Sequence, residues 1–351
     1  MFTGGHSAAA VRKSFHLVAA LLSVAACRTT DGNSGDDAPA DAAPDAVDGV
    51  GCTALTPRTV PLEAFVGPTG LQQRMTTLID SAQSTLDVQM YLFTVKPLAD
   101  RIAAAKQRGV AVRVILDPDE AGNAAVEPIL TSGGVTFRQA TALYTYSHAK
   151  YLIVDRSTVA IMSMNFNVDA MSNERNHGVI DKDPEDVSDV QAIFDMDWAA
   201  AGNEAPKAAN LTCTRLIVSP NNSKQRIIEH INSAKTTLEL ELMYLSETSV
   251  RNAVGQAKAR GVNVRVILED PTDESVTYLT GLAIPVKFPP NSIFLHSKLI
   301  IADGVAFVGS ENMSITSLSK NREVGVLVLE PAQQAVIKQS FESDWTASHT
   351  Q

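Results

Sequence analysis

The chain alternates between stretches with a helical hydrophobic period and short apolar runs typical of strands. The predicted helices are Gly70–Ser84, Lys96–Arg108 and Glu185–Ala201, and again Ser223–Thr236, Ser249–Arg260 and Ala332–Ser348. The predicted strands are Leu86–Phe93 and Val110–Leu116, and again Leu238–Tyr244 and Val262–Leu268. Alternating strands and helices predict an α/β layer fold with helices on both faces of a sheet.

The second half of the chain repeats the first. "AAAKQRGVAVRVILD", 103–117, returns as "GQAKARGVNVRVILED", 255–270, and "IFDMDW", 193–198, returns as "SFESDW", 340–345. Self-similarity at an offset of about 150 residues indicates two duplicated domains and not a solenoid. We therefore predict one domain at 53–205 and a second at 206–351.

The first residues lie outside this pattern. Arg12 and Lys13 precede "FHLVAALLSVAA", an apolar run too short to span a bilayer, so we predict that residues 1–26 are a secretory signal peptide. Its end, "VAAC", resembles the bacterial lipobox, which implies acylation of Cys27. The alternative is an ordinary signal peptide and a plain Cys27 thiol. Asp directly after the acylated cysteine would favour the inner membrane. Arg28 occupies that position instead, which points to the outer membrane.

Residues 27–52 are predicted to be the acylated cysteine and a disordered acidic linker. Residues 31–51 hold six Asp and no Lys or Arg, so this segment cannot bury enough surface to offset the entropy of ordering. Acyl chains would anchor the exported protein in the bacterial cell envelope, facing the periplasm or the cell surface. There Cys52 and Cys213 either form a disulfide or remain buried thiols.

One pattern of polar residues recurs beside the apolar strands of both halves, in "YSHAKYLIVD" (146–155) and "FLHSKLIIAD" (294–303). The repeated residues are His148, Lys150, Asp155, Ser163 and Asn165, and again His296, Lys298, Asp303, Ser310 and Asn312. Residues i and i+2 of a strand share a face, so the His and Lys of each copy point the same way. One copy would be a weak signal, but surface decoration does not explain two copies at nearly equal spacing.

This constellation resembles the phospholipase D superfamily, whose members carry two His-x-Lys-x4-Asp motifs, each with a following Gly-Ser-x-Asn. The second copy matches fully, with "HSKLIIAD", "GSEN" and "NRE". The first departs at Met162, where the family has Gly, and at Asn176, where the second copy has Glu323. The resemblance covers nearly all of the chain after Cys52. It implies two α/β/α sandwich domains related by a pseudo-two-fold axis, with one active site at their interface that is complete in a monomer.

The resemblance also implies a chemistry with which the residue types agree. Two Lys and two Asn supply donors for the charge of a phosphodiester and of its transition state. One neutral imidazole can attack phosphorus and form a phosphohistidine, while the other protonates the leaving alkoxide. Ammonium groups provide the electrostatic clamp, so no metal or other cofactor is expected. Asp155 and Asp303, at the ends of the apolar strands, are expected to be structural.

The single asymmetry between the copies predicts the roles of the two histidines. We expect Glu323 to face His296 and to hold it charged as the general acid and base. We expect Asn176 to orient His148 without charging it, which leaves His148 as the nucleophile. The neighbours Glu174 and His177 are alternatives for that orienting role. The tyrosyl-DNA phosphodiesterases are similar here, with an amide in the first half and a carboxylate in the second.

Three phosphodiester substrates or reactions remain open. The main expectation is hydrolysis or transfer of phosphatidyl groups of phospholipids, which export and an anchor favour. A nuclease of the same superfamily would need a basic groove, whereas 29 Lys and Arg face 39 Asp and Glu, a net charge of −10. A cardiolipin synthase-like phosphatidyltransferase would usually span the membrane, and this chain has no second apolar run of spanning length. A binding protein with a dead site fits poorly with two nearly intact motifs.

Overall fold

The computed structural model describes residues 55–351. The predicted signal peptide, Cys27, the acidic linker and Cys52 lie outside the described residues. Within the described part of the chain, no helix is both long enough and apolar enough to cross a membrane. Cys213 takes part in a disulfide. Its predicted partner, Cys52, is not among the described residues, so that pairing stays a prediction.

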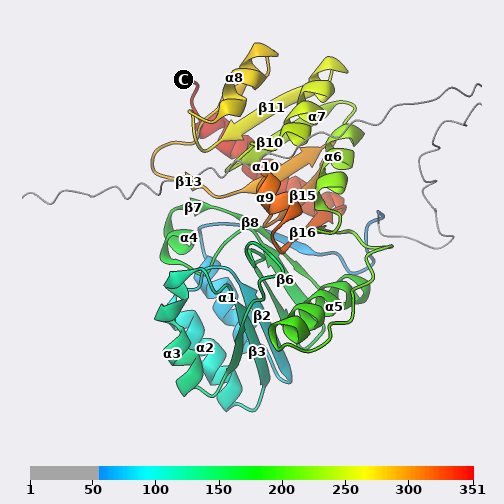
Figure 1. The fold of residues 1–351 in the computed structure, drawn as a ribbon. Coiled ribbons are helices and arrows are strands. Elements are labelled where there is room, and N and C mark those ends of the chain that lie inside the picture. The colour runs from blue at the N-terminus through cyan, green and yellow to red at the C-terminus, as the bar shows by residue number, and fades with distance from the viewer. Residues whose placement is uncertain (1–54) are drawn as a thin grey trace, which may run out of the picture. The chain divides into compact units, whose positions relative to one another are not determined.

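The described residues fold into two halves with nearly the same order of elements (Figure 1). The first half comprises β1 (Glu63–Val66), α1 (Leu71–Asp80), β2 (Thr85–Met90), α2 (Lys96–Gln107), β3 (Ala111–Leu116), a 3-10 helix (Ala121–Ala125), α3 (Glu127–Ser132), β4 (Thr136–Gln139), β5 (Tyr151–Val154), β6 (Thr158–Met162), α4 (Val168–Ser172), β7 (Glu174–Arg175), β8 (His177–Asp181) and α5 (Pro184–Ala201). The second half comprises β9 (Leu216–Ser219), α6 (Ser223–Ser233), β10 (Thr237–Leu242), α7 (Thr248–Ala259), β11 (Asn263–Leu268), α8 (Glu274–Gly281), β12 (Val286–Lys287), β13 (Phe294–Leu295), β14 (Lys298–Ala302), β15 (Val305–Gly309), α9 (Ile315–Ser319), β16 (Glu323–Val328) and α10 (Pro331–Ala347).

The Arg-Gly pairs end the second helix of each half, as the sequence predicts. Gly109 follows α2 with a φ of 95°, and Gly261 follows α7 with a φ of 87°. Glycine adopts this left-handed conformation without the penalty that a Cβ would bring. Both helices therefore stop at the point where the chain must turn into β3 or β11.

Each half contains a seven-stranded mixed sheet of the same topology. The strand orders are β1-β8-β6-β5-β2-β3-β4 and β12-β11-β10-β14-β15-β16-β9. β2, β3 and β4 run parallel, as do β10, β11 and β12, while β5 and β14 pair antiparallel with β2 and β10. The second order is the first read backwards, element for element. The predicted duplication and the predicted α/β class are confirmed.

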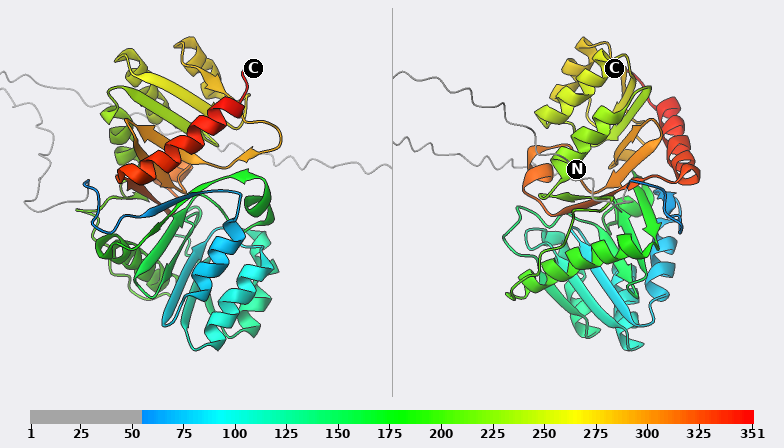
Figure 2. Two further views of the ribbon diagram at one scale, coloured as in Figure 1. Left: turned by 180° about the vertical axis from the view of Figure 1, so that it is seen from behind. Right: turned by 90° about the vertical axis from the view of Figure 1, so that its right-hand side faces the viewer.

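Apolar side chains form three cores. One lies between the first sheet and α1 and α2, and a second lies between the second sheet and α6 and α7. The third draws on both halves, and Tyr151, Phe194, Leu299 and Phe341 are among its buried members. α5 and α10 cover part of the inner faces of the sheets (Figure 2). The remainder of each inner face packs against the other sheet, which joins the halves without a helical layer between them.

A buried cluster of charges also joins the halves. Arg215, on the second half, lies 2.6 Å from Asp181, 2.7 Å from Asp186 and 2.7 Å from Glu330. Asp181 and Asp186 belong to the first half, and the Arg215 side chain is fully buried. Removing one member of such a cluster leaves an uncompensated buried charge, so the cluster ties the two halves together.

Candidate functional site

The two His-x-Lys pairs lie at the start of an inner antiparallel strand of each sheet. Lys150 directly precedes β5, and Lys298 is the first residue of β14. Both lysine side chains are buried, and each Nζ donates a hydrogen bond to the carbonyl of the motif histidine two residues earlier. The central strands therefore deliver both pairs to the edge of the sheet where the halves meet.

Two short parallel strand pairings join the halves beside these residues. β7 pairs with β13 (Figure 1), and the backbone N–H of His296 donates to the carbonyl of Arg175 at 3.1 Å. The equivalent pairing brings Ser147 beside Arg322, and the N–H of His148 donates to the carbonyl of Arg322 at 2.9 Å. The backbone of each motif histidine is thus held by the other half.

The imidazoles pair across the same boundary. Nδ1 of His148 lies 2.8 Å from Oε2 of Glu323, and Nδ1 of His296 lies 3.0 Å from Oδ1 of Asn176. The prediction that Glu323 faces His296 and that Asn176 orients His148 is therefore wrong. The parallel pairings explain why the orienting residues are swapped between the histidines. The carbonyl of each arginine binds the N–H of the motif histidine in the other half, and the orienting residue is the next residue after that arginine.

The partner of His148 is an ionised carboxylate. Glu323 is fully buried, and its Oε1 accepts hydrogen bonds from Ser317 Oγ at 2.6 Å and Asn321 Nδ2 at 2.9 Å. Burial alone would raise the pKa of Glu323, but the His148 ring and Lys150 hold that pKa below its ordinary value. A negative charge thus lies against Nδ1 of one histidine.

The partner of His296 is a neutral amide with a carboxyl behind it. Oδ1 of Asn176 also accepts from Ser163 Oγ at 2.8 Å, and its Nδ2 donates to Glu174 Oε2 at 3.2 Å. Glu174 Oε2 lies 3.8 Å from Nδ1 of His296, beyond hydrogen-bond distance. His177, the other predicted alternative, contacts the hydroxyls of Ser297 and Ser340 and orients neither motif histidine.

Burial shifts the cationic groups of the site toward their neutral forms. Burial lowers the pKa of Lys150 to about 7 and lowers the pKa of Lys298 well below its ordinary value. Burial also lowers the pKa of both His148 and His296, and the neighbouring lysines lower the pKa of His296 further. A bound phosphodiester would reverse these shifts, because its negative charge favours the cationic forms.

The motif Ser and Asn residues follow β6 and β15. Ser163 Oγ accepts the N–H of His177 at 3.0 Å, and Ser310 Oγ accepts the N–H of Val324 at 3.1 Å, so each serine holds the residue directly after an orienting residue. The side-chain oxygens of Asn165 and Asn312 are buried without a hydrogen-bond partner among the described residues. An unpaired amide oxygen accepts from a donor group, whereas phosphoryl oxygens would bind the Nδ2 groups of these amides.

The structure explains why Gly occurs in "GSEN" and Met in "MSMN". A Cβ on Gly309 would lie 2.4 Å from Oε2 of Glu311, which is fully buried. In the first half Met164 replaces this glutamate, and both Met162 and Met164 belong to the apolar core. The departure at Met162 therefore accompanies a change of core packing, from a buried carboxyl in the second half to two methionines in the first.

Asp155 and Asp303 lie at the far end of the motif strands from the histidines. The Asp155 carboxylate accepts the N–H groups of residues 83–85, and Asp303 accepts those of residues 235–237, at 2.7 to 3.1 Å. These bonds hold the pKa of each carboxyl below its ordinary value despite some burial. Asp155 therefore stabilises the turn that precedes β2, and Asp303 stabilises the turn that precedes β10.

Two carboxylates near the histidines were missed from the sequence. Asp117 Oδ2 accepts the N–H of Ser147 at 2.5 Å, and Glu269 Oε2 accepts the N–H of Leu295 at 2.6 Å. Each holds the residue directly before a motif histidine. The signal was present, because the repeated strands end in "VILD" and "VILED", but only the fold brings these ends to the motif.

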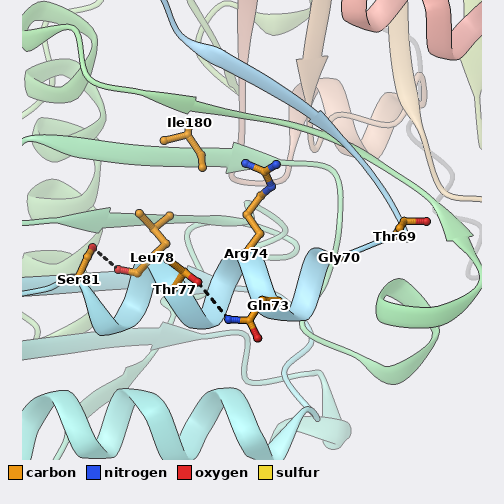
Figure 3. Close-up of a pocket in the computed structure, with 8 residues that line it drawn as sticks. All are labelled: Thr69, Gly70, Gln73, Arg74, Thr77, Leu78, Ser81 and Ile180. Carbon is orange, nitrogen blue, oxygen red and sulfur yellow. Dashed lines mark hydrogen bonds between the residues drawn. The ribbon is translucent and has the colours of Figure 1, made fainter.

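None of the motif His, Lys or Asn residues lines two other hollows, although the second borders Leu295, the residue before His296. A groove of about 440 Å³ runs along α1, lined by Arg74, Leu78 and Ile180 among others (Figure 3). A smaller cavity of about 150 Å³ lies beside Arg175 and Asp344. Among residues 55–351, no group of three or more His, Cys, Asp or Glu side chains is placed to hold a metal ion.

Comparisons with known proteins agree with this geometry. A family model described as "Cardiolipin synthase, PLD-like domain" matches residues 75–198 and 227–345. The chain is 25% identical over 334 residues to a cardiolipin synthase of Clostridium perfringens, covering 81% of this chain and 70% of that protein. It is 26% identical over 234 residues to a probable cardiolipin synthase of Bacillus subtilis, covering 58% of this chain and 46% of that protein.

A solved structure shares the fold. Phosphatidylserine synthase of Haemophilus influenzae superposes with a TM-score of 0.64 at 14% identity, over 82% of this chain and 86% of that chain. At this identity the likeness concerns the fold alone. The family model, in contrast, covers both halves and more than half of the residues. The chain therefore belongs to the phospholipase D-like family.

Proposed function

We propose that the protein is a phosphatidyltransferase that moves a phosphatidyl group from a phospholipid to an acceptor alcohol through a phosphohistidine. The observation that carries the proposal is the pair of oriented imidazoles, with Nδ1 of His148 at Glu323 and Nδ1 of His296 at Asn176. Fixing Nδ1 leaves Nε2 of each ring as the reacting atom. The cardiolipin synthases among the relatives support transfer over hydrolysis, the main expectation from sequence.

The crossed pairing supports His148 as the nucleophile, for a reason opposite to that predicted. When Nε2 of His148 attacks phosphorus, the bond from phosphorus to the leaving oxygen breaks, and the ring becomes a phosphorylated imidazolium. The Glu323 carboxylate stabilises that cation at Nδ1. His296, paired with an amide, gives its Nε2 proton to the leaving alkoxide, because no direct carboxylate partner retains it.

The second step reverses these roles. His296 Nε2 takes the proton of the acceptor hydroxyl while the acceptor oxygen attacks phosphorus and the P–N bond breaks. Lys150, Lys298, Asn165 and Asn312 supply donors for the phosphoryl oxygens throughout. Export and acylation at Cys27 remain predictions. They would hold the site near its lipid substrate.

The test offers the protein phosphatidylethanolamine vesicles with increasing glycerol, phosphatidylglycerol vesicles without added glycerol, and plasmid DNA in parallel, all with EDTA. We expect phosphatidylglycerol that rises with glycerol concentration in the first vesicles, cardiolipin and released glycerol in the second, and intact DNA. Phosphatidic acid as the sole product at every acceptor concentration would return the assignment to hydrolysis. Nicked DNA with intact lipid would favour the nuclease.

Leaving-group dependence tests the roles of the histidines. With a p-nitrophenyl phosphodiester, whose leaving group needs little protonation, His296→Ala should still release a burst and accumulate phosphoenzyme on His148. His148→Ala should give neither burst nor intermediate. The opposite pattern would exchange the two roles.

A further inference from the structure

The repeated Asp-Trp pair near the end of each half is not explained by the catalytic groups. Asp197 and Trp198 lie in the last turns of α5, and Asp344 and Trp345 lie in the last turns of α10. Each tryptophan stacks on the phenylalanine four residues earlier, at 6.0 Å between ring centroids. The tryptophans therefore contact a residue of their own helix, whereas the aspartates bind arginines of the other half.

Asp197 holds an arginine of the other half. Its Oδ2 lies 2.8 Å from Nε of Arg322, and its Oδ1 accepts from Nη2 at 3.0 Å. Arg322 also donates from Nη1 to the carbonyl of Ser219 at 2.9 Å, and its guanidinium lies 4.3 Å from the ring centroid of Tyr144. The Arg322 side chain is 1% exposed, so this bridge is sealed from water.

Asp344 holds the corresponding arginine of the first half. Its Oδ2 lies 2.8 Å from Nε of Arg175, and its Oδ1 accepts from Nη2 at 2.8 Å. The Arg175 side chain is 21% exposed and borders the cavity of about 150 Å³. At the equivalent place, Arg322 packs against the ring of Tyr144. The two bridges thus share their chemistry and differ in packing.

Both arginines occupy one position relative to the reacting groups. The carbonyl of Arg322 accepts the N–H of His148, and the next residue, Glu323, binds Nδ1 of that histidine. The carbonyl of Arg175 accepts the N–H of His296, and the next residue, Asn176, binds its Nδ1. A shift of either arginine therefore moves both contacts of one motif histidine together.

We propose that Asp197 and Asp344 are positioning residues, each of which fixes, through an arginine of the other half, the orientation of one motif histidine. Asp197 acts on His148 through Arg322, and Asp344 acts on His296 through Arg175. The inference rests on the proposed function, because it assigns the two aspartates to different chemical steps. Each aspartate accepts a hydrogen bond from Nη2 of its arginine and places its second carboxylate oxygen 2.8 Å from Nε, so both oxygens limit where the guanidinium can lie.

The test compares Asp197→Asn with Asp344→Asn, which keep the side-chain shape and remove the charge. Asp197→Asn should slow the phosphoenzyme burst by about tenfold or more on both p-nitrophenyl phosphodiester and phospholipid, with KM nearly unchanged. Asp344→Asn should slow turnover of phospholipid by a smaller factor and leave the p-nitrophenolate burst within about twofold. Because the first bridge is sealed and the second borders a cavity, we expect the larger loss in Asp197→Asn.

Glu330→Gln provides the matched control, since it weakens the buried charge cluster around Arg215 without touching either arginine of the bridges. It should lower the melting temperature and leave the burst and turnover rates of the folded fraction unchanged. If the two aspartate variants behave like this control, or lose both steps equally, the positioning role is refuted. Should Asp197→Asn not fold, Arg322→Lys keeps the charge, lacks the Nη2 group that donates to Asp197 and should give the same burst defect.

A readout without substrate separates the two proposals. In ¹⁵N spectra, Asp197→Asn should change the tautomer or pKa of His148 and leave His296 nearly unchanged, and Asp344→Asn should do the reverse. Unchanged histidine signals in both variants would refute the positioning role even in an active enzyme. A wild-type protein inactive on every phosphodiester would instead overturn the proposed function, while the histidine signals would still decide the positioning role.

Discussion

Oε2 of Glu323 lies 2.8 Å from Nδ1 of His148, although the two residues belong to different halves of the chain and are 175 positions apart. The carboxylate is buried, and this ring and Lys150 lower its pKa. Its charge is therefore directed at the histidine that we assign as the nucleophile. The site is a single unit that neither half contains alone.

Replacing this carboxylate tests what its charge contributes. Glu323→Gln should slow formation of the phosphohistidine by about 100-fold, because the amide no longer stabilises the phosphorylated imidazolium. The measurement is the burst rate with p-nitrophenyl phosphodiester. Asn176→Ala is the matched control, since it removes the partner of the other imidazole and should leave that burst within about threefold. Equal bursts in wild type and Glu323→Gln would contradict the assigned role.

The crossed contacts also predict that the halves cannot work apart. Residues 53–205 and 206–351, expressed separately, should each be inactive, because each lacks both the orienting partner and the backbone acceptor of its own histidine. Mixing the two fragments should restore activity if each folds. Full activity of either fragment as a monomer, measured after size-exclusion chromatography, would contradict the shared site.

The lowered pKa of Lys150 predicts a pH dependence. The ammonium form is present below its pKa of about 7 in the free enzyme and is lost as the pH rises through that value. For p-nitrophenyl phosphodiester, whose leaving group needs little protonation by His296, kcat/KM should therefore fall above about pH 7, while the burst rate at saturating substrate persists to higher pH because bound phosphodiester favours the charged lysine. Lys150→Arg stays charged and should flatten the fall, whatever its absolute rate. A wild-type kcat/KM that is flat to pH 9 would contradict this prediction.

Asp303 should affect stability more than catalysis. Asp303→Asn weakens charge-assisted bonds to the N–H groups of residues 235–237, which we expect to cost about 1–2 kcal/mol of unfolding free energy near pH 7. The pKa of Asp303 is lowered in the folded state, so its contribution is complete above the unfolded pKa and is lost as pH falls. In urea unfolding, the difference in free energy of unfolding between wild type and variant should thus become smaller below about pH 4.

Asp155→Asn is the matched variant in the first half and should behave alike, because Asp155 accepts the N–H groups of residues 83–85. Turnover by either folded variant should stay within about twofold of wild type. A large loss of turnover with unchanged stability would show that these aspartates act on the chemistry.

The sequence by itself determined which residues form the elements and which residue types enter the site. Helical and alternating hydrophobic periods are local properties, so the predicted boundaries of α2 and α7 lie within one residue of the observed ones. The two-residue spacing of His148 and Lys150 is equally local, and the duplication shows that the pattern was not accidental.

Only the tertiary structure decided which side chain orients which histidine. The choice depends on two parallel pairings between segments far apart in the chain, one of two residue pairs at Arg175 and one a single bridge at Arg322. Such short strands carry no periodic signal, and their register follows from how the two sheets pack through the shared apolar core. For the same physical reason the sequence shows Asp197 and Asp344 only as a repeat. Their arginine partners come from the other half and are set by that packing.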